Sequence, residues 1–190
     1  MESVIHSWFP RAVYFRPNIF NDRLETYEQE IKEGLARVGS VRTPTLNVDS
    51  SHKTSKNIFE VAQLEGLRQV FYEESRYFLE KIGYTKTDTL RFSNCWANIS
   101  YKGDYIFPHM HGYSVCSGAY YVKSSMDDKI KFFNTPSMLP DPEVWNEYNY
   151  NYAEYSCVPG SLLLFPADLQ HGTESQIGEE KIVISFNMIL

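Results

Sequence analysis

The chain has 190 residues, which is long enough for one domain with a sizeable core and too short for two comfortable ones. A hydrophobic fraction of 43% argues against a disordered chain, and a formal charge of −6 without a basic run leaves no visible nucleic-acid footprint. No stretch approaches the roughly 20 apolar residues of a membrane span, and Met1–Pro10 lacks an apolar signal core, so we expect a cytoplasmic protein without a membrane partner.

The first half of the sequence predicts a short strand followed by two amphipathic helices. The strand is Ala12–Arg16, ended by Pro17. The first helix begins after Asn21 or Asp22, either of which can cap it, and runs to about Val38, where Gly39 stops it. Its apolar stripe consists of Leu24, Tyr27, Ile31 and Leu35.

The second helix is predicted from about Phe59 to Ile82, closed by Gly83. Its apolar stripe consists of Leu64, Leu67, Phe71, Phe78 and Ile82. Each helix needs a sheet or another helix to cover this stripe. The polar stretch Ser40–Lys56 between the helices reads as a loop with at most a short extended piece.

From Thr89 onward the pattern changes to short strands separated by turns. The predicted strands are Leu90–Tyr101, Ser117–Lys123, Lys129–Phe133, Ala153–Val158, Ser161–Phe165 and Lys181–Ile189. The insert Asn134–Asn151 is a long loop, and such loops on a β-scaffold often form lids or substrate walls. Helices followed by many strands indicate an α+β fold in which a β-barrel or sandwich is backed by helices.

The cysteines Cys95, Cys116 and Cys157 are odd in number and widely separated, and none belongs to a CxxC pair. This spacing fits neither a zinc knuckle nor a disulfide framework. Each is flanked by apolar or aromatic residues, so we predict buried free thiols in a reducing compartment.

The histidines of the β half suggest a metal site. His109 and His111 form a His-Met-His motif, and in a strand residues i and i+2 point to the same face. His171, from a distant strand, could complete a facial site, although imidazole alone does not choose between Fe, Zn, Cu and Ni. An isolated HxH pair is more often a surface or core pair, and we take His6 and His52 as surface or core residues.

The final strand carries a basic residue where an apolar one would be expected. Lys181, Val183, Ser185 and Asn187 share one face, and the alternate residues Ile182 to Met188 should pack on the helices. If Lys181 faces the same interior as His171, it requires an anionic partner, which a dicarboxylate would supply. The alternative is a lysine at a strand edge that points to solvent.

Several segments together resemble a known family. These segments are Trp96–Asn98, Lys102–Asp104, His109–His111, Ser117–Val122, Gly160–Pro166, His171 and Ile184–Asn187. In order and spacing they are similar to the 2-oxoglutarate/Fe(II)-dependent oxygenases of marine bacterial and cyanophage type, which are distant relatives of prolyl hydroxylases. The resemblance covers about Thr89 to Leu190.

The resemblance implies one domain over residues 1–190. Residues 1–88 would form a strand and supporting helices, and residues 89–190 a double-stranded β-helix (jelly-roll) with iron at one open end. The usual ligands of this superfamily are His-x-Asp/Glu and a distal His. His109 and His171 take the histidine positions, whereas His111 stands where the carboxylate would be.

By the same resemblance, the basic residue about ten positions after the distal histidine binds 2-oxoglutarate. Lys181 takes this position, where many relatives carry Arg, and it would pair with a carboxylate as a point charge. Ser185 could add a hydrogen bond, and Asn98 and Tyr121 are further candidates for the pocket wall, with Tyr120 as the alternative to Tyr121. For both tyrosines core packing is an equal alternative.

The implied cofactors are Fe(II) and 2-oxoglutarate, and the implied reaction is an O2-dependent hydroxylation in which 2-oxoglutarate gives succinate and CO2. The insert aromatics Trp145, Tyr148, Tyr150 and Tyr152 could then form a substrate wall or pack on the barrel. The prime substrate, a peptide or a small molecule, is not readable, and a homodimer is possible. If a phage encodes the chain, the compartment is the host cytoplasm.

Two other classes of protein stay open from the sequence. A cupin-like three-His metal enzyme would not use 2-oxoglutarate; three histidines favour it, and Lys181 disfavours it. A non-catalytic barrel protein would bind a ligand without needing iron. A zinc hydrolase is disfavoured because no acid is evidently placed as a general base beside the histidines.

Overall fold

The computed structural model describes residues 10–43, 46–54, 57–135, 140–146 and 148–190. The predictions for His6 and for the absence of an export signal before Pro10 concern residues outside these ranges. The helical elements are η1 (Asn21–Arg23, a 3-10 helix), α1 (Leu24–Val38), α2 (Ile58–Val61) and α3 (Leu67–Lys81). The first strands are β1 (Tyr14–Arg16), β2 (Leu46–Asn47), β3 (Asp49–Ser50), β4 (Arg91–Tyr101) and β5 (Tyr105–His109). The remaining strands are β6 (Cys116–Lys123), β7 (Lys129–Phe133), β8 (Tyr152–Ser156), β9 (Leu162–Pro166), β10 (His171–Thr173) and β11 (Glu180–Ile189).

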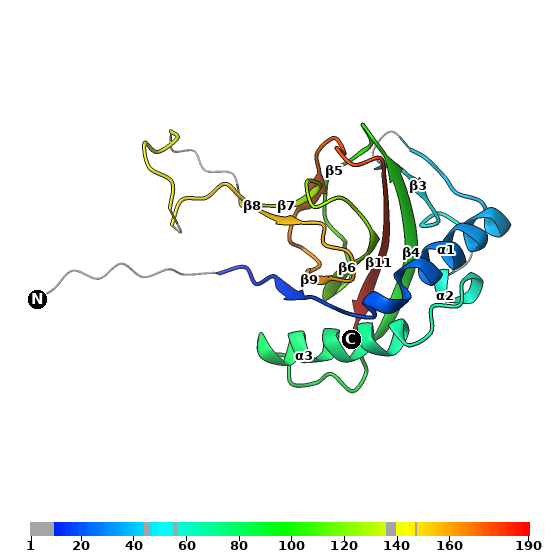
Figure 1. Ribbon diagram of the computed structural model, residues 1–190. Helices are drawn as coiled ribbons and strands as arrows, with labels where there is room; N and C mark the ends of the chain where they lie inside the picture. The colour runs from blue at the N-terminus through cyan, green and yellow to red at the C-terminus, as the bar shows by residue number, and fades with distance from the viewer. Residues whose placement is uncertain (1–9, 44–45, 55–56, 136–139, 147) are drawn as a thin grey trace, which may run out of the picture.

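The described strands form two antiparallel sheets, with the helices on the outer side of one of them (Figure 1). The major sheet has the order β1-β9-β6-β11-β4-β3, and the minor sheet has the order β2-β5-β10-β7-β8. Neighbours in each sheet are mostly distant in sequence, as in a jelly roll. The expected α+β fold with a double-stranded β-helix is therefore confirmed.

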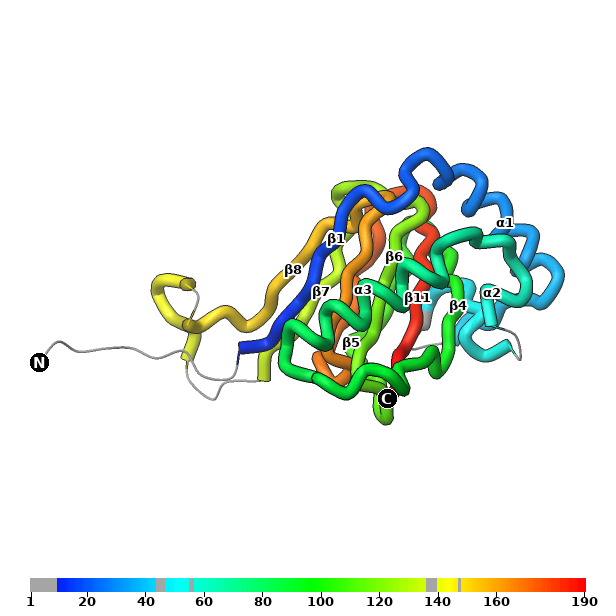
Figure 2. Tube along the Cα trace, turned by 90° about the horizontal axis from the view of Figure 1, so that it is seen from below, coloured from blue at the N-terminus to red at the C-terminus, as the bar shows by residue number. Residues whose placement is uncertain are grey.

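The helices cover the outer face of the major sheet and form the larger hydrophobic core with it. Figure 2 shows α3 running across β6 and β11. Phe71 of α3 stacks on Phe186 of β11, with the ring centroids 4.7 Å apart. The predicted stripe residues Tyr27, Ile31 and Leu35 of α1 are buried in this core.

A second, smaller core lies between the two sheets. It contains Tyr121 of β6, Phe132 of β7, Phe165 of β9 and Val183 of β11. Because side chains alternate along β11, Ile182, Ile184, Phe186 and Met188 pack against the helices instead, as predicted. This alternation leaves Lys181, Val183 and Ser185 on the inner face, where they line a cavity.

The first predicted helix differs from the structure at its N-terminal end, and the second differs by an internal break. Neither Asn21 nor Asp22 caps α1, because both lie in η1 and the residue at the cap position is Arg23. The second helix is not continuous: it is broken between α2 and α3, where Gly66 has a φ of 81°. The break exposes the Glu65 carbonyl, which accepts a hydrogen bond from the Tyr27 hydroxyl at 2.7 Å. The apolar periodicity of the sequence did not reveal this break, because buried leucines lie on both sides of it.

The strand predictions agree with the structure to within two residues at most ends, but β5 and β10 were not predicted as strands. Both are short, and Pro108 and Gly172 weaken their patterns.

At the end of the second helix Ile82 is 36% exposed, although it was predicted in the buried stripe. The three cysteines are free and buried, as expected. Within the described residues, no helix is both long and apolar enough to cross a membrane.

Candidate metal centre and adjoining pocket

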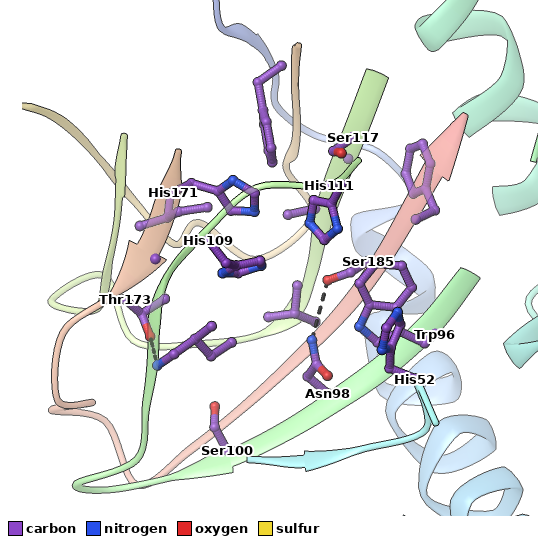
Figure 3. Close-up of a pocket in the computed structure, with 18 of the residues that line it drawn as sticks. His52, Trp96, Asn98, Ser100, His109, His111, Ser117, His171, Thr173 and Ser185 are labelled. Carbon is purple, nitrogen blue, oxygen red and sulfur yellow. Dashed lines mark hydrogen bonds between the residues drawn. The ribbon is translucent and has the colours of Figure 1, made fainter. Parts of the chain in front are cut away.

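Three histidines converge at one end of the space between the sheets (Figure 3). His109 is the last residue of β5 and His171 is the first residue of β10, and the two are direct partners in the antiparallel register. His111 lies two residues beyond β5, so the two histidines of the HxH motif do not share one strand, which the i, i+2 argument had assumed. Its backbone N–H instead donates to Ala167 O at 2.9 Å, which holds the turn against the loop before β10.

The ligand atoms of the three imidazoles lie within 4.8 Å of one another. The ring centroids are 4.4 Å apart for His109 and His171, 5.0 Å for His109 and His111, and 5.1 Å for His111 and His171. Two nitrogens bound to one metal ion are at most about 4.2 Å apart, given metal–nitrogen bonds of about 2.0–2.1 Å, so the imidazoles would draw together on binding one ion. The structure thus brings together the three predicted ligands.

Backbone carbonyls orient two of the rings. Nδ1 of His109 lies 2.9 Å from Phe107 O, and Nδ1 of His171 lies 2.9 Å from Leu169 O. A carbonyl oxygen can only accept, so each Nδ1 carries the proton and donates it. Each Nε2 is then unprotonated and free to bind a metal, with the ring orientation fixed by its outer hydrogen bond.

Burial keeps the inner two imidazoles neutral. Burial, followed by the neighbouring charge of His109, lowers the pKa of His171 to about 3 and that of His111 to about 4. Neutral imidazole is the form that binds a metal, so these rings need not lose a proton at neutral pH.

No carboxylate joins the histidine cluster within the described chain. Asp104, the nearest acid in sequence, accepts hydrogen bonds from Arg42 at 2.7 Å and from the Tyr101 backbone N–H at 2.8 Å. Burial raises the pKa of Asp104, but the hydrogen bonds from Arg42 and Tyr101 outweigh this and lower it. The Lys-Gly-Asp segment is therefore a turn, and His111 stands where a carboxylate ligand would be expected.

The histidines open into a cavity of about 380 Å³ between the two sheets. This volume lies in the usual range for small-molecule sites. Its lining contains the three histidines and all four predicted cofactor-binding residues, namely Asn98, Tyr121, Lys181 and Ser185. In the β4–β11 register Lys181 is opposite Ser100, Val183 is opposite Asn98 and Ser185 is opposite Trp96. The polar residues thus form two adjacent rows on the cavity floor.

Lys181 is the buried cation of this cavity. Its side chain is only 5% exposed, and its ammonium group forms no hydrogen bond or ion pair with any residue that the structure describes. An ammonium group withdrawn from water without a counter-charge is costly. The charge of Lys181 contributes to the lowered pKa of Asp104, and an anion bound in the cavity would supply a second counter-charge. The alternative of a solvent-facing edge lysine is excluded.

The two tyrosines of β6 have opposite roles in packing. Tyr121 lines the cavity, whereas the hydroxyl of Tyr120 donates to Ile19 O at 2.7 Å on the helix side of the sheet. Burial raises the pKa of Tyr121 well above its ordinary value, so its hydroxyl stays protonated. The sequence left open which of the two tyrosines faces the pocket, and in the structure it is Tyr121.

Asn98 also presents an unsatisfied polar atom. Its Nδ2 donates to Ser185 Oγ at 3.4 Å, shown by a dashed line in Figure 3, while its buried Oδ1 has no hydrogen-bond partner within the structure as described. Buried polar atoms in native proteins usually have a partner. The orphaned oxygen beside the histidines is thus a position where a bound molecule or water can donate.

Sequence reasoning missed the residues at the cavity mouth. His52 and Lys53, in the loop after β3, line the cavity together with Trp96. The His52 ring lies 4.4 Å from the Trp96 ring, and Trp96 lies 5.8 Å from His111. His52 is exposed, as expected of a surface residue, but the sequence did not indicate that it lines the cavity. No local pattern marks it, because it reaches β4 through the two-residue strand β3, which pairs with Ile99 and Asn98, and through hydrogen bonds between Ser51 and Ala97.

The insert between β7 and β8 does not form a wall of the cavity. None of its described residues lines it, and Trp145, Tyr148 and Tyr150 are exposed. Figures 1 and 2 both show this yellow segment projecting away from the barrel. The structure therefore does not support the prediction of a substrate wall. It also does not support packing of these aromatics on the barrel, with one exception: Nζ of Lys131 in β7 lies 4.4 Å from the centroid of the Tyr152 ring.

A jelly roll with a histidine cluster at one open end and a buried cation deeper in the same cavity defines a metal-binding protein that takes an anionic small molecule. Residues 94–187, about half of the chain, match the family model described as "Putative 2OG-Fe(II) oxygenase". The chain belongs to this family of 2-oxoglutarate/Fe(II)-dependent oxygenases. No curated protein matches it in sequence.

Solved structures resemble the chain in fold at low sequence identity. The epimerase SnoN from nogalamycin biosynthesis has 12% identity and a TM-score of 0.67, over 94% of this chain and 76% of SnoN. HygX from Streptomyces hygroscopicus, solved with nickel, 2-oxoglutarate and hygromycin B, has 12% identity and a TM-score of 0.60, over 94% of this chain and 82% of HygX. A Pseudomonas putida prolyl-4-hydroxylase has 9% identity and a TM-score of 0.61, over 95% and 94%.

Proposed function

We propose that this oxygenase binds Fe(II) through His109, His111 and His171 and hydroxylates a substrate in an O2-dependent reaction, with 2-oxoglutarate anchored by Lys181. One observation carries the proposal: a cluster of three imidazoles and a buried, unpaired ammonium group line the same cavity. A metal dication and a dicarboxylate satisfy both features, whereas either one alone leaves the other unexplained.

The residues fit these two groups. Imidazole nitrogen suits iron, and a three-imidazole set leaves coordination positions open for a chelating ligand and for O2. Iron bound there supplies the oxidative decarboxylation of 2-oxoglutarate to succinate and CO2 that is coupled to hydroxylation of a C–H bond. HygX, a structural neighbour, was solved with nickel and 2-oxoglutarate, which supports the same pairing here.

The protein's own residues bind and orient the co-substrate in this proposal. Lys181 pairs with the far carboxylate, as a point charge without the two-pronged geometry of Arg. The protonated hydroxyl of Tyr121 interacts with the thiol of Cys157, and it would turn from this thiol to donate to the same carboxylate. Ser185 can donate to the part nearer the histidines. Asn98 accepts a hydrogen bond at its orphaned Oδ1. The apolar side chains of Ile130 and Val183 exclude water from this end.

The absence of a carboxylate ligand changes the charge of the centre. A metal dication held by three neutral imidazoles keeps its full charge of +2, which is one more positive charge than in a site where one ligand is Asp or Glu. We expect this charge to strengthen the attraction for anionic 2-oxoglutarate and to shift the redox tuning of the iron.

Other expectations stay predictions and belong to the same proposal. Residues 1–190 would act as one domain, with residues 1–88 supporting the barrel of residues 89–190. The enzyme would work in the cytoplasm, and a homodimer and a marine bacterial or cyanophage relationship would be consistent with it. The prime substrate would be a peptide or a small molecule.

The test is a visible spectrum of the protein with Fe(II) and 2-oxoglutarate in the absence of oxygen. Chelation of the keto acid by iron gives a charge-transfer band. We expect the band in the wild type, its loss in His111→Ala and Lys181→Ala, and its retention in Lys102→Ala, a lysine outside the cavity that pairs with Glu179.

Each contrary result has a distinct meaning. Survival of the band in His111→Ala would show that His111 is not an essential ligand. Iron binding without a band in the wild type would favour a cupin-like three-His enzyme that does not use 2-oxoglutarate. Absence of iron binding would favour a non-catalytic barrel protein.

A further inference from the structure

The cavity lining has an uneven charge. It includes the cations Lys53 and Lys181 and four histidines, and no Asp or Glu belongs to it among the residues that the structure describes. Cavities lined by one sign of charge concentrate ligands of the opposite sign. The composition of the whole chain does not explain this, because acids outnumber bases by 24 to 18.

The proposed co-substrate accounts for only part of this charge. The two carboxylates of 2-oxoglutarate match the metal dication at one end and Lys181 at the other. The metal, the co-substrate and Lys181 together then keep a net charge of +1, because two negative charges meet three positive ones. Lys53, at the mouth, is left without a negative partner.

Lys53 forms no ion pair or hydrogen bond within the described structure, unlike several other lysines near the surface. Lys102, for example, lies 3.1 Å from Glu179, and Lys32 lies 2.8 Å from Glu180. An unpaired lysine at the opening of an acid-free cavity is available to a ligand. An exposed lysine by itself is an ordinary solvated side chain, so the case for a binding site depends on the residues beside Lys53.

His52 stands beside Lys53 and is held in place from two sides. Its ring lies against Trp96 (Figure 3), and its Nε2 is 3.2 Å from Nδ2 of Asn94. Because Asn94 Nδ2 is a donor, His52 Nε2 accepts, and the neutral ring carries its proton on Nδ1. His52 is therefore a fixed donor next to a free cation.

The rest of the mouth is apolar. Trp96 is buried between His52 and His111, and it forms a flat wall next to the metal ligands. Phe107 and Met110 also line the cavity and are 50% and 59% exposed, so each presents apolar surface to an incoming molecule. The mouth thus combines an apolar lip with one cation and one hydrogen-bond donor.

We propose that the prime substrate is an organic anion with an apolar body, bound at this mouth. Its carboxylate or phosphate group pairs with Lys53 and His52, and its body lies against Trp96 and Met110, which brings its C–H bonds to the open side of the histidine cluster. The inference rests on the proposed function for the reaction itself, but the binding site is a property of the mouth residues.

The experiment measures the binding of model anions by isothermal titration calorimetry. The protein is first saturated with Mn(II) and 2-oxoglutarate without oxygen, so that the inner site is filled. The probes are 2-naphthoate, 2-naphthyl phosphate and uncharged 2-naphthamide, which share one apolar body. We expect at least one anion to bind about tenfold or more tightly than the amide, and comparison of the two anions identifies the preferred group.

Variants assign this preference to the mouth. In Lys53→Gln and His52→Gln the preference for the anion should fall at least severalfold, while Lys86→Gln, an exposed lysine outside the cavity, should behave as the wild type. Equal binding of amide and anions, or an unchanged preference in Lys53→Gln, would overturn the proposal. A preference lost in Lys181→Met and kept in Lys53→Gln would also overturn it, because the anion would then occupy the inner site.

The two proposals fail separately. In His171→Ala, which removes a metal ligand, the preference for the anion should persist, because His52 and Lys53 do not depend on the metal. A protein without the charge-transfer band that still prefers naphthoate would refute the proposed function and keep the anion site. A protein with the band that does not distinguish the probes would do the reverse.

Discussion

Nδ1 of His111 lies 3.4 Å from Nδ2 of Asn187, whose Oδ1 accepts a hydrogen bond from Ser117 Oγ at 2.7 Å. When His111 binds a metal through Nε2, its proton moves to Nδ1 and needs an acceptor. A half-turn of the Asn187 amide supplies Oδ1 to that proton and directs Nδ2 to Ser117, whose hydroxyl can accept as well as donate. His111 has no backbone carbonyl partner, unlike His109 and His171. Its ring is therefore oriented by the Asn187 amide, which can turn over because Ser117 can either donate to it or accept from it.

Asn187→Ala should weaken metal binding without removing it. The variant deletes the partner of His111 Nδ1, and loss of such an outer hydrogen bond typically costs about 10–100-fold in metal affinity. The measurement is a calorimetric titration with Mn(II), which is stable in air and needs no turnover.

The matched control is Asn187→Asp, which keeps an acceptor of similar size at the same place. Its carboxylate should restore most of the affinity, because it accepts the Nδ1 proton of a metal-bound imidazole strongly. If the two variants bind Mn(II) equally well, Asn187 only fills space.

Lys181→Met should separate binding from stability. Without 2-oxoglutarate the variant should unfold at a higher temperature than the wild type, because it replaces a buried, unpaired ammonium by an apolar chain of similar length. Its affinity for 2-oxoglutarate should fall by roughly 2–5 kcal/mol, as for truncation of one partner of a buried charged pair.

Thermal unfolding of both proteins with and without 2-oxoglutarate and Mn(II) measures both effects. The ligand should raise the unfolding temperature of the wild type by mass action and leave Lys181→Met nearly unchanged. Lys102→Met, at an exposed lysine, should respond to the ligand as the wild type does. A variant that is less stable without ligand would indicate that Lys181 has a structural partner.

Gly118→Ala tests the packing that supports the cavity floor. A Cβ at this position of β6 would lie 2.2 Å from Cζ of Phe186, whose ring is stacked on Phe71. The ring cannot move without disturbing the contact between α3 and the major sheet, so we expect a loss of about 1–3 kcal/mol in the free energy of unfolding. Gly112→Ala, where nothing lies within 4 Å of the added Cβ, should be close to neutral. Urea unfolding of both variants decides this.

The sequence was informative wherever a pattern is local. The alternation of β11 placed Lys181 and Ser185 on the inner face, and the spacing of the histidines predicted the cluster that the fold brings together. These predictions succeeded because strand periodicity determines the direction of a side chain once one face is known to be apolar.

The failures share a different cause: they depend on contacts between distant segments. His52 reaches the cavity because the two residues of β3 pair with β4, and no composition signal accompanies such a short strand. The break at Gly66 is stabilised by Tyr27, from the preceding helix, through the carbonyl of Glu65. The projecting insert was misjudged because exposed aromatics look the same in sequence as those that line a pocket.

A network of four charges ties α1 to the major sheet and should make stability depend on pH. Glu180 of β11 accepts from Lys32 and Lys123 at 2.8 Å, and Glu28 of α1 accepts from the same two lysines at 2.7 and 2.8 Å. Burial raises the pKa of both glutamates, but the hydrogen bonds from the lysines outweigh it and lower both below their ordinary value of 4.5.

Because the folded-state pKa values are depressed, the network's contribution is present above pH 4.5 and is lost as the pH falls through them. Glu28→Gln/Glu180→Gln should therefore lower the free energy of unfolding at pH 7 by about 1 kcal/mol, a small value because the lysines are partly exposed.

The difference in the free energy of unfolding between the wild type and this double variant should shrink steadily below pH 4.5, where both carboxylates of the wild type also become neutral. Glu33→Gln removes a carboxylate of α1 that accepts from Gln29 and belongs to no ion pair among the described residues, so it should leave the pH profile unchanged. Urea unfolding at a series of pH values measures the profile, and a difference between wild type and double variant that stays constant down to about pH 3 would mean that the glutamates act through packing and not through charge.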